Sequence, residues 1–187
     1  GSEHTVAVYN DNFIEDIDLS ESHIHFFRLK NEKEVKENEK LWKLYFAELK
    51  SRTTKQNKSA RLRELLDEAV EKSTPSGFCI KGQAYHFGKL DDGSSHTKDH
   101  KLALEFYQKA IREKNPNELL HTFALVNSGL LYEKLGDRNS LNAALRHFAL
   151  AKYLRNPKAP KFFERVKKRL NDGSYETAAN HNNTKLN

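Results

Sequence analysis

Two features of this sequence have residue types that could carry chemistry: a single thiol and a pair of closely spaced imidazoles. Cys79 lies between Phe78 and Ile80, a setting typical of a buried packing thiol and not of an exposed nucleophile. His96 and His100 are four residues apart, which is a metal-ligand spacing on a helix. Because the pair straddles a loop and a helix start, solvated loop residues are favoured over a metal site.

Other catalytic signatures are missing from the 187 residues. There is no glycine-rich phosphate loop, no serine elbow and no paired-cysteine zinc pattern. Because catalysis needs a convergent set of reactive groups, we expect a binding module and not an enzyme. No cofactor and no metal ion are predicted.

The composition favours amphipathic helices, since 37% of the residues are hydrophobic and 31% are charged. No stretch approaches the roughly 18 consecutive apolar residues of a membrane span. The lone cysteine favours an intracellular, reducing compartment, either cytoplasm or nucleus. Because the chain opens with Gly1-Ser2 and lacks methionine, we expect the natural N-terminus upstream, where a mitochondrial transit peptide or an anchor could have been removed.

The charges are unevenly placed along the chain. Residues 1–27 contain six acids and no Lys or Arg, whereas residues 155–169 contain seven bases and one acid, Glu164. Two interpretations of the acidic arm remain open: it packs on the first hairpin of its own chain, or it is a docking segment for a partner. Opposite charges at the two ends favour a second copy of this chain as that partner, with the acidic arm of one molecule on the basic segment of another.

A repeat of 41 residues organises the middle of the chain. One pattern, displaced by 41 residues at each position, recurs as Ala103-x3-Tyr107-x2-Ala110-x5-Pro116 and Ala144-x3-Phe148-x2-Ala151-x5-Pro157. A fainter copy in the same register consists of Leu62, Leu66, Ala69 and Pro75. Alanine lets two helices cross closely, the aromatic residue fills the groove, and proline ends the helix.

Each clear copy is preceded by a matching half, Gly82-x2-Tyr85-x2-Gly88 and Gly129-x2-Tyr132-x3-Gly136. This half is displaced by 47 residues, so the first copy has six extra residues in its loop, at 89–96. A glycine inside a helix costs roughly 1 kcal/mol relative to alanine, which predicts close packing at Gly82 and Gly129. Asp99 and Ser140 are the expected N-caps of the second helices.

These motifs resemble the tetratricopeptide superfamily, and the long period resembles its Sel-one-like subclass. The resemblance implies an all-α fold, a short right-handed solenoid of about three helix-turn-helix repeats over residues 34–157. The expected units are 34–75, 76–116 and 117–157. In the first unit, which lacks the glycine signature, helices are expected at Glu34–Arg52 and Ser59–Ser73. An extended acidic arm (1–33), a basic capping helix (158–171, helical from Ala159 to Leu170) and a disordered tail (172–187) complete the expected organisation.

In this superfamily the concave face, built by the first helix of each hairpin, commonly carries the ligand. Mapped onto this sequence, the face contains Cys79 and the partner-binding candidates Ile80, Gln83, His86, Phe87, Phe123, Val126, Asn127, Leu130, Glu133 and Lys134. The family's carboxylate clamp is disfavoured because only Asn127 matches it. The resemblance therefore implies a scaffold or adaptor that binds a peptide or helix of another protein in a mixed apolar and polar groove.

Nucleic-acid binding is the alternative, because helical repeats can bind RNA and the C-terminal segment is basic. Its candidate surface consists of Lys158, Lys161, Arg165, Lys168 and Arg169. Phe162 and Phe163 resemble packing residues, and the segment lacks the exposed aromatics of a base-stacking platform. Protein binding is therefore the favoured interpretation.

Overall fold

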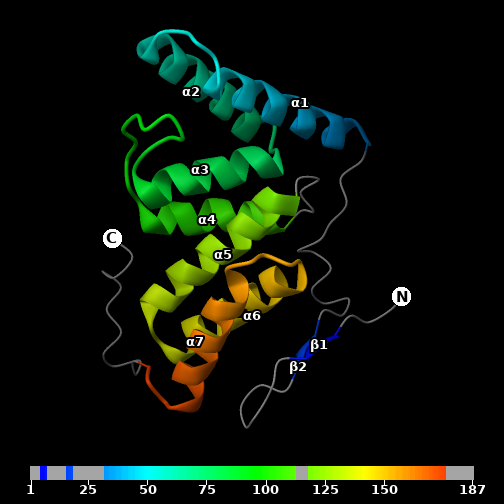
Figure 1. Ribbon diagram of the computed structural model, residues 1–187, viewed down its shortest axis with the longest axis vertical. Helices are drawn as coiled ribbons and strands as arrows, with labels where there is room; N and C mark the ends of the chain where they lie inside the picture. The colour runs from blue at the N-terminus through cyan, green and yellow to red at the C-terminus, as the bar shows by residue number, and fades with distance from the viewer. Residues whose placement is uncertain (1–4, 8–15, 19–31, 113–117, 176–187) are drawn as a thin grey trace. The chain divides into compact units, whose positions relative to one another are not determined.

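Helices account for nearly all of the structure, a computed structural model that describes residues 5–7, 16–18, 32–112 and 118–175 (Figure 1). The helices are α1 (Glu32–Leu49), α2 (Lys55–Glu71), α3 (Pro75–Phe87), α4 (His100–Ile111), α5 (Glu118–Leu135), α6 (Arg138–Tyr153) and α7 (Ala159–Asn171). The predicted all-α class is confirmed. Two strands, β1 (Thr5–Ala7) and β2 (Asp16–Asp18), pair antiparallel within the segment expected to be an extended arm. The last two residues of that expected arm, 32 and 33, belong to α1; its other residues and most of the tail lie outside the described residues.

Polar side chains at the N-caps fix where four helices begin. Thr54, Thr74, Asp99 and Asp137 each accept a hydrogen bond from the backbone amide three residues later. The prediction that Asp99 is an N-cap is confirmed, but the prediction that Ser140 is an N-cap is wrong. Helix α6 begins earlier than expected, so Ser140 donates its amide and its hydroxyl to Asp137, at 2.9 and 2.6 Å.

The chain divides into two compact units, and the division lies inside α5. The α1–α4 unit comprises residues 27–124, and the α6–α7 unit comprises residues 125–187 with residues 1–26. No helix in the described part of either unit is both long and apolar enough to cross a bilayer.

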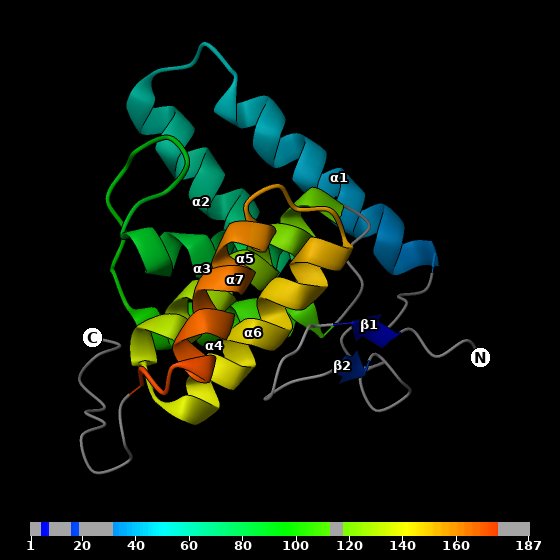
Figure 2. The same cartoon turned by 60° about the horizontal axis from the view of Figure 1, so that its bottom comes forward.

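The core of the α1–α4 unit forms where α1, α2 and α3 meet. It consists of Tyr45, Leu62, Leu65, Leu66, Ile80, Ala84 and Leu90. A buried amide joins α1 to α3, because the Asn38 side-chain oxygen accepts a hydrogen bond from the Ser76 amide at 3.0 Å. The same helices are seen from a second direction in Figure 2.

The α6–α7 unit is built around two buried rings, Phe148 on α6 and Phe163 on α7. Phe148 also packs against Gly129, so α5 and α6 approach closely. On α7, the apolar residues Phe163, Val166 and Leu170 are buried, while the intervening positions carry charged residues, of which Glu164 is acidic and the others are lysines and arginines. The predicted amphipathic helix after Pro157 is therefore confirmed.

Several contacts recur with the period of the sequence. After α2 and after α6, three backbone hydrogen bonds join the same relative positions: 72 to 68, 73 to 70 and 74 to 69, then 154 to 150, 155 to 152 and 156 to 151. The two turns are 82 residues apart, which is two periods, and each holds one non-glycine residue in the left-handed region, Ser73 (φ 55°) and Arg155 (φ 65°). The same three bonds also close α7, at residues 172–174, where Gly173 has φ 69°.

Candidate protein-binding surface

The residues of α3 that were predicted to bind a partner lie in different environments. Ile80 is 4% exposed and belongs to the core of the α1–α4 unit, so its side chain packs internally and is not available to a partner. Gln83 and His86 are half-buried. Phe87, the last residue of α3, is 51% exposed.

Contacts beneath Phe87 hold its ring in place. The His86 ring stacks on it with centroids 4.3 Å apart and planes 15° apart. His86 Nδ1 lies 3.0 Å from the hydroxyl of Tyr107, and Tyr107 is fully buried against Gly82. The exposed ring is therefore attached to the α3–α4 core through a chain of direct contacts.

The segment 88–99, which joins α3 to α4, is anchored to the first two helices. The Tyr45 hydroxyl donates to Asp91 at 2.7 Å, the Ser59 hydroxyl donates to Asp92, and Arg63 donates to the Ser95 carbonyl at 2.6 Å. In both ribbon views this segment rises from the α3–α4 pair toward α2 (Figures 1 and 2). We name it the anchored loop.

The pKa values of two groups reflect this anchoring. Burial, followed by the neighbouring Asp91 carboxylate, raises the pKa of the Tyr45 phenol well above its ordinary value, so Tyr45 remains a donor. Burial also acts to raise the pKa of Asp92, but hydrogen bonds from Ser59 and Ser94 outweigh it and the pKa is lowered. Asp91 and Asp92 are therefore engaged on the side of α1 and α2, whereas Asp99, the third acid of the loop, caps α4.

Three lysines on the segments next to Phe87 are not engaged in this way: Lys89 and Lys98 in the anchored loop, and Lys101, which follows His100, whose ring contacts His86. Lys89, Lys98 and Lys101 are exposed, and among the residues that the structure describes they form no ion pair. Lys98 lies beside the residue that follows Phe87, because a Cβ on Gly88 would be 3.3 Å from the Lys98 Cβ. The surface around Phe87 is consequently aromatic and basic.

The predicted face residues of α5 fall on both sides of the unit division. Phe123 in the α1–α4 unit is 36% exposed. In the α6–α7 unit, Val126 is 5% exposed, so it is a packing residue and not a partner contact. Asn127 and Leu130 are half-buried, and Lys134 is exposed. Glu133 pairs with Arg165 of α7 at 2.7 Å.

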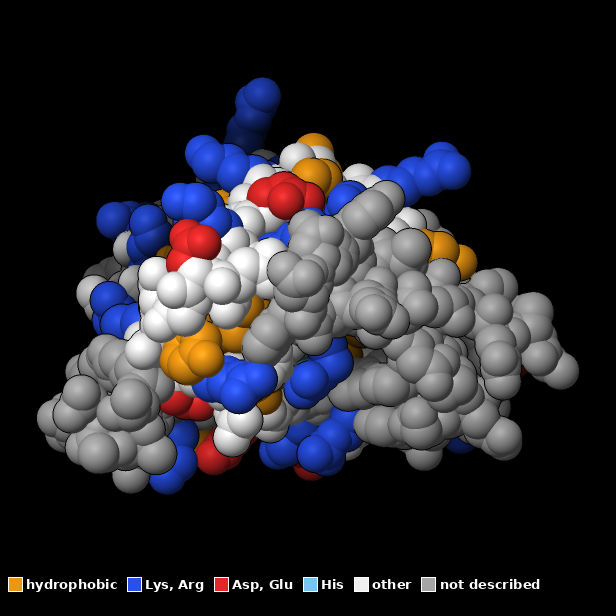
Figure 3. All heavy atoms as spheres, turned by 90° about the horizontal axis from the view of Figure 1, so that it is seen from below, with side chains coloured by type: hydrophobic (Ala, Val, Ile, Leu, Met, Phe, Trp, Pro, Cys, Tyr) orange, Lys and Arg blue, Asp and Glu red, His pale blue; other side chains and the backbone are white. Residues whose placement is uncertain are grey.

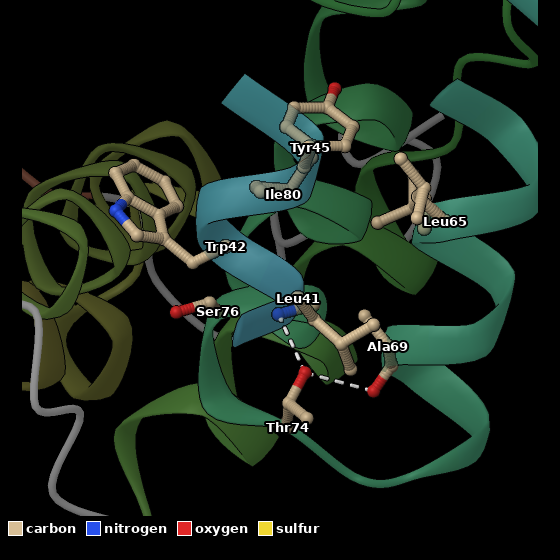
Figure 4. Close-up of a pocket in the computed structure, with 10 residues that line it drawn as sticks. Leu41, Trp42, Tyr45, Leu65, Ala69, Thr74, Ser76 and Ile80 are labelled. Carbon is tan, nitrogen blue, oxygen red and sulfur yellow. Dashed lines mark hydrogen bonds between the residues drawn. The ribbon is translucent and has the colours of Figure 1, made fainter. Parts of the chain in front are cut away.

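A small cavity lies between α1, α2 and α3 (Figure 4). Its volume is about 10 Å³, close to the minimum that holds one water molecule. Leu41, Leu65, Ala69 and Ile80 surround it, and the nearby Thr74 hydroxyl is occupied by the Ala69 carbonyl and the Gly77 amide. The cavity is therefore a packing defect and not a ligand site.

The candidate reactive residues are placed as packing groups. Cys79 is fully buried, and its thiol donates to the Leu120 carbonyl at 3.3 Å; burial raises its pKa to about 12. His96 packs edge-on against Tyr85. The prediction that both histidines are solvated is wrong for His100, which is 8% exposed and contacts the His86 ring. Within the described ranges no group of three His, Cys, Asp or Glu residues is arranged to hold a metal ion.

The basic residues of α7 are partly engaged by neighbours. Arg165 pairs with Glu133 and lies 4.8 Å above the Phe162 ring, and Arg169 donates to the carbonyls of Ser174 and Glu133. Lys158, Lys161 and Lys168 are exposed. Figure 3 views the molecule from below and shows Lys and Arg in several groups separated by other side chains. Phe163 is buried, as expected of a packing residue.

No pattern in the sequence indicated the anchored loop or the buried Asn38. Tyr45 and Ser59 are separated from their aspartates by 46 and 33 residues, so no local pattern connects them. The run Asp91-Asp92-Gly93-Ser94 predicted a turn, and the structure contains that turn. The run did not predict which residues of α1 and α2 the turn contacts.

Comparison of the chain with protein-family models, with curated proteins and with solved structures gives no match.

Proposed function

We propose that this chain is a helical-repeat scaffold or adaptor that binds a segment of another protein, and that it is not an enzyme. The observation that carries the proposal is the exposure of Phe87. It lies on the first helix of a hairpin, at a predicted face position, and stacking on His86 keeps it in place. Exposed aromatics that are already fixed lose little conformational entropy on binding, and such residues often dominate interfaces.

Repeat organisation supports the same role. We infer that the helices form a short solenoid of tetratricopeptide-like hairpins, in an intracellular compartment where the single thiol stays reduced. Two equivalent contacts favour this arrangement: Gly82 packs on Tyr107, and Gly129 packs on Phe148. Two equivalent ring pairs, Tyr85–Phe106 and Tyr132–His147, accompany them.

The test is affinity capture from cell extract, read by mass spectrometry. The wild-type chain is compared with Phe87→Ser and with Leu44→Ser, a matched control because Leu44 is also an exposed apolar residue, at 41%. We expect a set of partners to be lost with Phe87→Ser alone. If both variants capture the same proteins as wild type, Phe87 is not the binding residue and the proposal fails.

RNA binding through α7 is a second candidate, favoured by the exposure of Lys158, Lys161 and Lys168. Contacts to phosphates release counterions, so such binding weakens steeply as salt rises. Reversing the three lysines to glutamate should abolish binding to a single-stranded RNA probe. If RNA binding survives these changes, α7 is not the RNA site.

A further inference from the structure

We propose that the surface around Phe87 docks an acidic peptide segment in which carboxylates alternate with large apolar side chains. This inference rests on the proposed function and names the chemistry of the partner. The docking surface is defined as Phe87 with Lys89, Lys98 and Lys101. Phe87 supplies an apolar contact, and the lysines supply charges for carboxylates on either side of it.

Two of the three acids of the anchored loop are engaged by the first two helices, and the third, Asp99, caps α4. Asp91 and Asp92 are held by Tyr45 and Ser59, on the side of α1 and α2. Lys89 and Lys98 lie at the two ends of the same loop and are exposed. Because all three acids accept hydrogen bonds from groups other than these lysines, the positive charges remain available to a ligand.

The two ends of the loop meet next to Phe87. The His96 amide donates to the Gly88 carbonyl at 3.0 Å, and the Asp99 amide donates to the Tyr85 carbonyl at 2.9 Å. Gly88 itself has φ +71° and a Cβ there would contact Lys98. This bonding brings the backbones at Lys89 and Lys98 close to the end of α3, so both lysines lie next to Gly88, the residue that follows Phe87.

Charge complementarity decides the kind of occupant. A nucleic-acid backbone that binds tightly usually engages several basic residues along its length. This surface offers three lysines, and the acid Asp99 stands between two of them in the sequence, which disfavours a nucleic acid. A short peptide with a few carboxylates needs fewer cations, and its apolar side chain fits the face of a single phenylalanine. The acidic peptide is therefore the better match.

This chain contains a segment with the required chemistry, which supplies a probe. Residues 11–21 carry five acids, interleaved with Phe13, Ile14, Ile17 and Leu19. A fluorescein-labelled peptide of residues 11–21 is titrated with the full chain and followed by anisotropy. Two further peptides serve as controls: one with every acid changed to its amide, and one with the four apolar residues changed to serine.

We expect saturable binding of the parent peptide and at least about tenfold weaker binding of each control peptide, a change of about 1.4 kcal/mol. Phe87→Ser, and separately the pair Lys89→Glu and Lys98→Glu, should each weaken binding by a similar factor. The matched charge control is Lys50→Glu with Lys55→Glu, two exposed lysines elsewhere in the α1–α4 unit, and this variant should bind like wild type. Circular dichroism of each variant confirms that it is folded.

Three outcomes would overturn the inference: no saturable binding of the parent peptide at millimolar concentration, equal binding of the amide peptide, or equal loss with the charge control. Poly-uridylate is tested in parallel. If it binds with the same lysine dependence but without dependence on Phe87, the surface is a polyanion site. If the peptide fails while captured partners still depend on Phe87, the proposed function stands and only the acidic chemistry is wrong.

Discussion

Gly82 packs so closely on Tyr107 that a Cβ added to the glycine would lie 2.7 Å from Cδ1 of the ring. The same relationship holds between Gly129 and Phe148, where the closest ring carbon, Cε1, would be 2.6 Å away. Neither ring can retreat easily, because both are fully buried. At these two positions the usual helical preference for alanine is reversed.

We therefore expect Gly82→Ala to lower the free energy of unfolding by about 1–3 kcal/mol, as overpacking does, although alanine is the better helix former. Urea denaturation measures the change. In the double variant with Tyr107→Leu, the two losses should be less than additive, because the smaller side chain makes room for the methyl group. A stabilising Gly82→Ala would contradict the close packing.

Asn38 is the buried polar group on which the α1–α3 contact depends. It is 1% exposed and accepts the amide of Ser76 in the first turn of α3. Asn38→Ala leaves that donor buried without its partner, so we expect a loss of about 1–3 kcal/mol in thermal or urea unfolding. Asn139→Ala, at an exposed position of α6, is the matched control and should change stability by less than about 0.5 kcal/mol.

The anchored loop should detach in steps when its hydrogen bonds are removed. Tyr45→Phe removes the bond to Asp91 and Ser59→Ala removes the bond to Asp92, and each should cost about 1 kcal/mol. Hydrogen exchange of the amides at 89–98 should rise in both variants. Tyr153→Phe, at an exposed tyrosine of the α6–α7 unit, should leave that exchange unchanged.

His147 should make stability depend on pH. Burial lowers its pKa to about 4, whereas an exposed histidine has a pKa of about 6.5. The unfolded chain therefore binds the proton first, so the stability is complete above about pH 6.5 and falls as the pH decreases toward 4, by about 3 kcal/mol at most. His147→Phe should flatten this part of the pH profile; an unchanged profile would show that His147 is not the responsible group.

Cys79 should be inert in the folded protein. Its thiol is fully buried and its pKa is raised to about 12, so both access and thiolate formation are blocked. A thiol reagent at pH 8 should react with it only at the rate of unfolding, and the rate should rise with urea. Fast labelling under native conditions would contradict the burial.

Local patterns predicted what depends on local chemistry. The period of Ala103, Tyr107 and Ala110 identified helices, and the helical glycines predicted where two helices pack closely. The anchoring of Asp91 by Tyr45 could not be predicted, because it joins residues 46 positions apart. Ile80 and Val126 were assigned to the binding face because the repeat register identifies a helix face only coarsely; the structure buries both.

The matching turns at Ser73 and Arg155 have a consequence for the length of the chain. Because the same three hydrogen bonds close both turns, the backbone leaves α2 and α6 in the same direction relative to the helix it has completed. We therefore predict that a duplication of a whole unit made at such a turn folds as an added module, whereas one made in mid-helix does not. Circular dichroism and urea denaturation of the two lengthened proteins measure the difference.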